Sequence, residues 1–124
     1  MTANPPQHDL SDNELARKFM EFSLREYDAH YADDVKQINR LRRRKKAIVD
    51  ALDAHGPSAR QALLPLLDHA NAQVRLDAAT YLKSREPQRA FATLRDIAAN
   101  GPGVQRGMAG MSLYYSESGI GKPP

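Results

Sequence analysis

The residues of this sequence whose types and spacing best suit a binding function are basic. Six cations stand within seven residues in the run RLRRRKK, residues 40–46. Cations at this density neutralise phosphates and release counterions, so such binding weakens as salt is added. The same field attracts the carboxylates of an acidic protein surface. Within this block Arg40, Arg42, Arg43 and Arg44 are the candidate partner-binding residues.

Three interpretations of the basic block remain open. In an antiparallel hairpin that turns near Ala32, Glu26 would lie close to Arg40 and Glu21 close to Arg43 or Arg44. These exposed pairs would contribute about 0 to 1 kcal/mol each and leave a solvated face without a function. Otherwise the block binds an acidic protein or a nucleic acid. Binding of single-stranded nucleic acid favours aromatic side chains among the cations, and this block has none.

The remaining polar residues form no recognisable catalytic or metal-binding pattern. The four histidines, at positions 8, 30, 55 and 69, lack the spacing of metal ligands. Gly101 and Gly103 with Gly107 resemble a phosphate-binding loop, but no strand precedes them and no Lys-Ser or Lys-Thr pair follows. No Ser/His/Asp arrangement can be singled out. We therefore expect no catalytic residue, no metal site, no cofactor and no enzymatic activity.

The first half of the chain is predicted to form a long antiparallel helical hairpin. Ser11 and Glu14 have the spacing of a capping box, which places a helix start there. An apolar stripe continues to about His30, interrupted by Glu26. A second stripe runs to Gly56, a predicted helix end, through Val35, Ile38, Leu41, Ile48 and Leu52.

Four further helices are predicted in the second half. Pro57 opens a short third helix through Leu67, and Asn71 caps a fourth that runs to about Ser84. Pro87 opens a fifth helix through Ala99, and a sixth runs from Val104 to about Tyr115. Shifting the chain by 30 residues pairs Pro57 with Pro87, Leu64 with Leu94 and Val74 with Val104. A repeat of this period is typical of a helical solenoid.

Composition bounds the architecture. With 124 residues the chain suits one domain, over residues 10–116, with flexible tails at 1–9 and 117–124. Aromatic residues are 6% and the helix formers Ala, Leu, Arg and Glu are plentiful, which predicts an all-α fold. Cysteine is absent, and no apolar run reads as a signal peptide or a membrane span. We therefore expect a cytoplasmic protein.

Residues 57–84 resemble a HEAT repeat. Pro65 stands where such repeats carry a proline in the first helix, and Val74 with Arg75 match the Val-Arg that opens the second. The buried positions of the second helix match Ala78, Ala79 and Leu82, whereas His69 replaces the usual Asp. Residues 12–115 also resemble small bacterial HEAT-like domains of unknown function. The resemblance implies a short α-solenoid, an N-terminal hairpin followed by about two helix pairs, and implies no activity.

Taken together, these features predict a non-catalytic protein-binding module, by analogy a bacterial immunity or adaptor protein. Stacked helix pairs leave a shallow concave face, on which we expect Gln73, Asp77, Thr80, Tyr81 and Lys83 to point outward. Tyr114 and Tyr115 are candidate anchors for a protein partner. The alternative is a nucleic-acid-binding protein that uses the basic helix at residues 40–46. No membrane partner is expected.

Overall fold

The computed structural model describes residues 9–118, and all regular secondary structure in this range is helical. The predicted all-α fold class is confirmed. The chain divides into two compact units, residues 1–65 and residues 66–124, which are described separately. In chain order the helices are α1 (Asp12–Tyr31), α2 (Val35–His55), the 3-10 helix η2 (Ala59–Asp68), α3 (Ala72–Leu82), α4 (Pro87–Asn100) and α5 (Gly103–Ser118).

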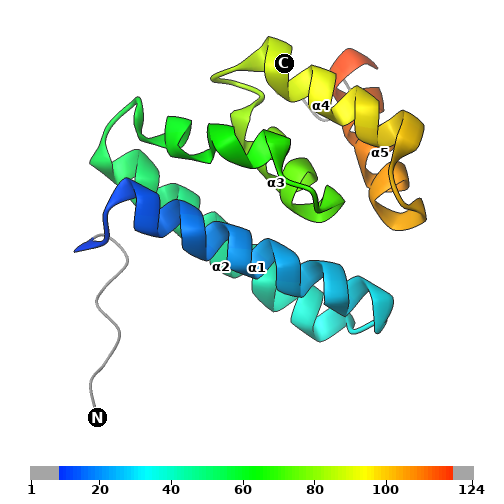
Figure 1. Cartoon of the computed structure of the whole chain (residues 1–124), viewed down its shortest axis with the longest axis horizontal. Helices are drawn as coiled ribbons and strands as arrows, with labels where there is room; N and C mark the ends of the chain where they lie inside the picture. The colour runs from blue at the N-terminus through cyan, green and yellow to red at the C-terminus, as the bar shows by residue number, and fades with distance from the viewer. Residues whose placement is uncertain (1–8, 119–124) are drawn as a thin grey trace. The chain divides into compact units, whose positions relative to one another are not determined.

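The first unit contains the predicted antiparallel hairpin of α1 and α2, which run side by side in Figure 1. The capping box is present: the Ser11 hydroxyl accepts a bond from the Glu14 backbone N–H, and the Glu14 carboxylate accepts one from the Ser11 N–H. At the far end of the hairpin, His55 Nδ1 lies 2.7 Å from Asp12 Oδ1. The last residue of α2 therefore lies beside the first residue of α1.

A tight turn reverses the chain between α1 and α2. Asp33 adopts φ 56°, a left-handed conformation that Asp tolerates better than most residues. Asp34 then caps α2, because its side chain accepts a hydrogen bond from the Gln37 N–H. Val35 was expected in the buried stripe, but it is 60% exposed. That prediction was wrong because Val35 is the first residue of α2, directly after the turn, where little of α1 is left to cover it.

The short helix after Gly56 was expected to be like the others, but η2 is a 3-10 helix. Pro65 lies inside it. Proline has no N–H for an α-helical bond, and its ring clashes with the carbonyl four residues earlier, so a tighter helix with different hydrogen bonds is accommodated more easily.

The second unit packs α3, α4 and α5 together. Asn71 caps α3 by accepting bonds from the N–H groups of Gln73 and Val74, and Pro87 occupies the first turn of α4 as predicted. The core includes Leu82, Leu94 and Ile97, each 0% exposed. Helix α5 extends to Ser118, past the end predicted near Tyr115.

The predicted tails, 1–9 and 117–124, lie outside the described residues except for Asp9 and the end of α5. Among the helices of the described range, none combines the length and the apolar character needed to cross a membrane.

Candidate functional site

The basic block lies on α2, and its side chains project in several directions because seven residues cover almost two helical turns. Arg40, Arg42, Arg43 and Arg44 are exposed, as a binding role requires. Lys45 is the exception, since it is buried at 2% exposure. The block is therefore split between five exposed cations, the four arginines and Lys46, and one lysine, Lys45, that points into the fold.

Lys45 belongs to a buried polar cluster in the hairpin. Its Nζ donates a hydrogen bond of 2.6 Å to Glu26 Oε1, and Glu26 is fully buried. On the other carboxylate oxygen, His30 Nε2 lies at 3.0 Å and Arg42 Nε at 3.6 Å. Glu26 was expected near Arg40, but its partners include Lys45 and Arg42, so the hairpin register differs from the predicted one. The break in the apolar stripe is thus an internal ion cluster.

The outward side of α2 carries a row of cations at spacings of four and three: Lys36, Arg40 and Arg43. This basic row faces away from the buried side, which holds Leu41 and Lys45. Among the side chains that the structure describes, no acid forms an ion pair with any member of the row. Lys36 was not predicted from the sequence as a binding residue, although its spacing from Arg40 and Arg43 indicates a shared helix face.

Arg42 and Arg44 flank this row, and Arg42 is the one that lies near the Glu26 carboxylate. Arg44 stacks its guanidinium over the ring of Phe22, at 5.9 Å from the ring centroid, within range of a cation–π contact. The predicted partner Glu21 forms no ion pair with Arg43 or Arg44 in the described part of the chain. The acids of α1 therefore leave most of the exposed arginines without a direct counter-charge.

The predicted concave face is wrong for two of its members. Gln73 is 0% exposed and Asp77 is 8% exposed. Both belong to a buried chain of hydrogen bonds: Gln105 Nε2 donates to Gln73 Oε1 at 2.9 Å, and Gln73 Nε2 donates to Asp77 Oδ1 at 3.0 Å. The prediction assumed one open side on this helix, whereas most residues of α3 are buried.

The other members of that predicted face are accessible to different degrees. Thr80 is exposed, while Tyr81 and Lys83 are half-buried. Lys83 Nζ donates to Ser112 Oγ at 3.2 Å, which ties α3 to α5. This contact gives Lys83 a role in packing within the second unit.

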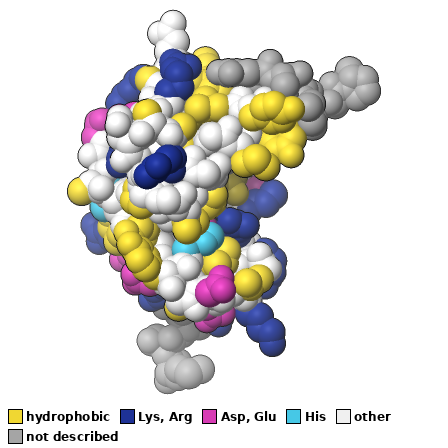
Figure 2. Space-filling view, turned by 90° about the vertical axis from the view of Figure 1, so that its right-hand side faces the viewer, with side chains coloured by type: hydrophobic (Ala, Val, Ile, Leu, Met, Phe, Trp, Pro, Cys, Tyr) yellow, Lys and Arg dark blue, Asp and Glu magenta, His cyan; other side chains and the backbone are white. Residues whose placement is uncertain are grey.

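Tyr114 and Tyr115 are 57% and 42% exposed and contact each other edge to face, with ring centroids 5.5 Å apart. Figure 2 shows hydrophobic side chains reaching the surface on the face that it presents, beside separate Lys and Arg groups. Both tyrosines are thus accessible on the surface of α5, and their role as anchors for a protein partner stays a prediction.

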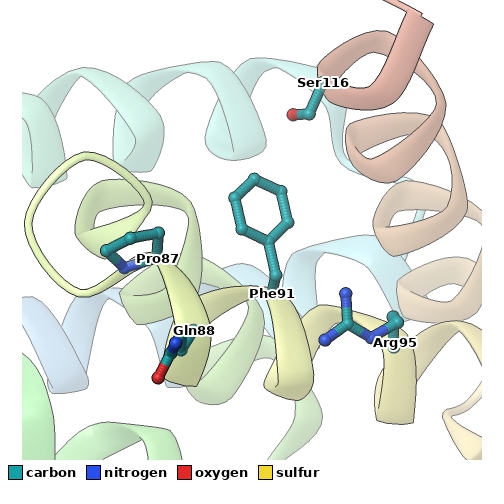
Figure 3. A pocket seen from close by; sticks show the side chains of 5 residues that line it. All are labelled: Pro87, Gln88, Phe91, Arg95 and Ser116. Atoms are coloured by element: carbon teal, nitrogen blue, oxygen red, sulfur yellow. The ribbon is translucent and has the colours of Figure 1, made fainter.

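An open pocket of about 340 Å³ lies between α4 and the end of α5. Figure 3 shows that four of its five lining side chains come from α4 and that the Phe91 ring projects toward Ser116 of α5. The polar groups in it are Gln88, Arg95 and Ser116. Its five described lining residues include no acid and no histidine.

Metal ligands and nucleophiles were also sought among the described side chains. No group of three or more His, Cys, Asp or Glu residues in the described range is placed to hold a metal ion. The buried Ser23 hydroxyl lacks a hydrogen-bond partner among the described residues, and it lies one turn from the paired Glu26 on α1.

Comparison with known proteins places the chain in a family. The chain is similar to the protein RPA1889 from Rhodopseudomonas palustris CGA009, whose crystal structure matches with a TM-score of 0.89 and 30% sequence identity. The match covers 98% of this chain and 100% of that one. No curated protein matches at a significant level. A family model described as a domain of unknown function, DUF2019, matches residues 13–116. The chain therefore belongs to the DUF2019 family of domains of unknown function.

Proposed function

We propose that this protein is a non-catalytic protein-binding module that uses the basic row of α2 to hold an acidic surface of a partner protein. The observation that carries the proposal is that Lys36, Arg40 and Arg43 share one exposed helix face without ion pairs in the described part of the chain. The row spans about 10 Å along the helix axis. Carboxylates on one face of a partner helix have the same spacing.

The setting of the row supports recognition. Helix α2 is held against α1 by a buried apolar seam that includes Phe19, Leu41 and Ile48. The backbone that carries the cations is therefore already ordered, and only the side chains lose freedom on binding. Exposed cations also accelerate the encounter with an acidic partner and suppress contact with basic ones.

The polar clusters support a binding role over a catalytic one. Lys45 and His30 both bond to the Glu26 carboxylate inside the hairpin, and the hydrogen-bond chain of Gln105, Gln73 and Asp77 is buried in the second unit. Side chains engaged in this way stabilise the fold and do not face a substrate pocket.

The proposal also includes a HEAT-like fold, a cytoplasmic location and a biological role, for which the support comes from the sequence. The 30-residue offset between the Pro57 and Pro87 segments supports a HEAT-like arrangement of helix pairs, a type of fold that binds through its exposed helices. The absence of cysteine agrees with a cytoplasmic location. An immunity or adaptor role is the biological form that we propose for such a module.

Nucleic acid is the second candidate for the same row, because unpaired arginines at this density also suit phosphates. The composition of α2 favours the protein partner, since no aromatic residue lies among its cations to stack on bases. The two candidates share the surface and differ in the partner, so one experiment separates them.

The test is affinity capture from a lysate of the host, with nuclease treatment, at low and high salt. The variant Arg40→Glu/Arg43→Glu reverses two charges of the row, and Arg17→Glu/Arg25→Glu reverses two exposed charges of α1 as the matched control. We expect a nuclease-resistant protein that the control retains and the α2 variant loses, with affinity reduced about tenfold or more. A retained toxin-like chain would specify immunity.

Two outcomes count against the proposal. Retention of nucleic acid alone, lost with salt and with the α2 reversal, would assign the row to phosphates. Equal retention by the wild type and both variants would show that the row is a solvated face.

A further inference from the structure

The hydrophobic side chains that remain exposed gather on one helix. Six large hydrophobic residues are exposed in the described range, and four of them lie on α5: Val104, Met111, Tyr114 and Tyr115. Val104, Met108, Met111 and Tyr115 succeed one another at spacings of four, three and four, so they form one continuous apolar row. An isolated exposed hydrophobic residue needs no explanation, but a row along a whole helix indicates an interaction surface.

A second row on α5 lies beside the first and faces directly outward. Its members are Gly103, Gly107, Gly110 and Tyr114, again at spacings of four, three and four. This row is opposite Gln105 and Ala109, which are buried in the second unit. A Cβ added to any of the three glycines would meet nothing within 4 Å. Packing within the chain therefore does not require them to be glycine, although Gly107 and Gly110, inside the helix, each destabilise it by about 0.5 to 1 kcal/mol.

The side chains of the outward row differ in size along the helix, so the row on one copy can fit the same row on a second copy. The row is small at its N-terminal end and carries the large Tyr114 at its C-terminal end. If two copies of α5 pack antiparallel about a two-fold axis near Gly110 and Met111, Tyr114 of each copy lies over Gly107 of the other. A parallel pair would instead set Tyr114 against Tyr114. A two-fold interface requires a self-complementary patch of this kind.

The charge of α5 is compatible with packing against a second copy of this chain. Arg106 is the one charged residue of α5 through Ser116, so two copies brought together meet no row of like charges. Over residues 103–116 the face thus lacks a row of charges that would select a charged partner. We propose that this protein forms a homodimer through antiparallel packing of α5 on α5 of a second copy, centred on Gly110 and Met111. This dimer uses a different surface from the basic row of α2.

The first test is sedimentation equilibrium of the full chain. The contact involves one helix from each copy and is small, so concentrations up to about 500 µM are needed. We expect a mass that rises with concentration from 13.8 kDa toward twice that value. A mass that stays at 13.8 kDa over the whole range would overturn the proposal.

A matched pair of variants ties the dimer to α5. Gly107→Glu places a charge in the interface where space is open, and it raises helix propensity, so it does not weaken the fold. Ala47→Glu places the same charge on the exposed side of α2. We expect dimerisation to weaken tenfold or more in the first variant only, with unchanged far-ultraviolet circular dichroism. An equal effect of both variants, or none, would refute the assignment to α5.

Cysteine cross-linking tests the orientation, because the chain contains no cysteine. In the antiparallel pair the two Gly110 residues are adjacent, whereas the two Gly103 residues are roughly 22 Å apart along the helix. Gly110→Cys should therefore give a disulfide-linked dimer on oxidation, and Gly103→Cys should not. Cross-linking of both variants would indicate parallel packing, and cross-linking of neither would exclude this interface.

Discussion

The buried ion cluster of the hairpin is expected to control its stability. We predict that Lys45→Met destabilises the protein by about 3 kcal/mol. This change keeps the aliphatic stem of the side chain and removes the ammonium group. It leaves Glu26, which is 0% exposed, without its closest cation.

The magnitude follows from the geometry. At the 2.6 Å separation of Lys45 Nζ and Glu26 Oε1, the attraction between unit charges is about 6 kcal/mol at an effective dielectric constant of about 20. In the intact pair, the desolvation cost of the two charged groups offsets most of this attraction. Removal of one partner of a buried pair costs about 3 to 5 kcal/mol. We expect the lower end because His30 and Arg42 remain within 3.6 Å of the other carboxylate oxygen.

The assay is urea denaturation followed by far-ultraviolet circular dichroism, with Lys46→Met as the matched control. Lys46 pairs with Asp50, but both side chains are more than 60% exposed, so the control should lose less than about 1 kcal/mol. A loss for Lys45→Met that equals the loss for Lys46→Met would refute the reasoning. It would mean that the buried carboxylate does not depend on Lys45.

Three further predictions concern local structure. Ser11→Ala removes the N-cap acceptor of α1 and should lower the free energy of unfolding by about 1 kcal/mol in the same denaturation assay. Gly101→Ala should destabilise the protein, because the new Cβ would lie 2.7 Å from the carbonyl oxygen of Ile97, and its melting temperature should fall below that of the wild type. The hydrogen bond that Tyr27 donates to Tyr31 raises the pKa of Tyr27 above 10.0. Tyr31→Phe should lower that pKa toward 10.0 in an ultraviolet absorbance titration, and an unchanged titration would argue against this bond.

Local chemistry made the helices predictable from the sequence. The Ser11 capping box, the Asn71 cap and Pro87 in the first turn act through neighbouring residues, so each marks a helix start wherever the chain lies in space. Apolar periodicity likewise placed the buried face of α2 at Ile38, Leu41, Ile48 and Leu52. The exposure of the four predicted arginines followed from their density, because a helix cannot bury so many charges on one side.

Tertiary structure decided which polar residues are buried and with what partners. Glu26 and Lys45 are 19 positions apart, and their pairing depends on the hairpin register, which no local signal encodes. Gln73 and Asp77 resemble surface residues in sequence, yet they are buried because α3 packs with α4 and α5 in the second unit. The apolar and glycine rows of α5 are visible in the sequence as spacings, but only the packed structure distinguishes an exposed row from a buried one. The physical reason is that burial depends on neighbours distant in the chain, whereas caps and periodicity depend on neighbours within a few residues.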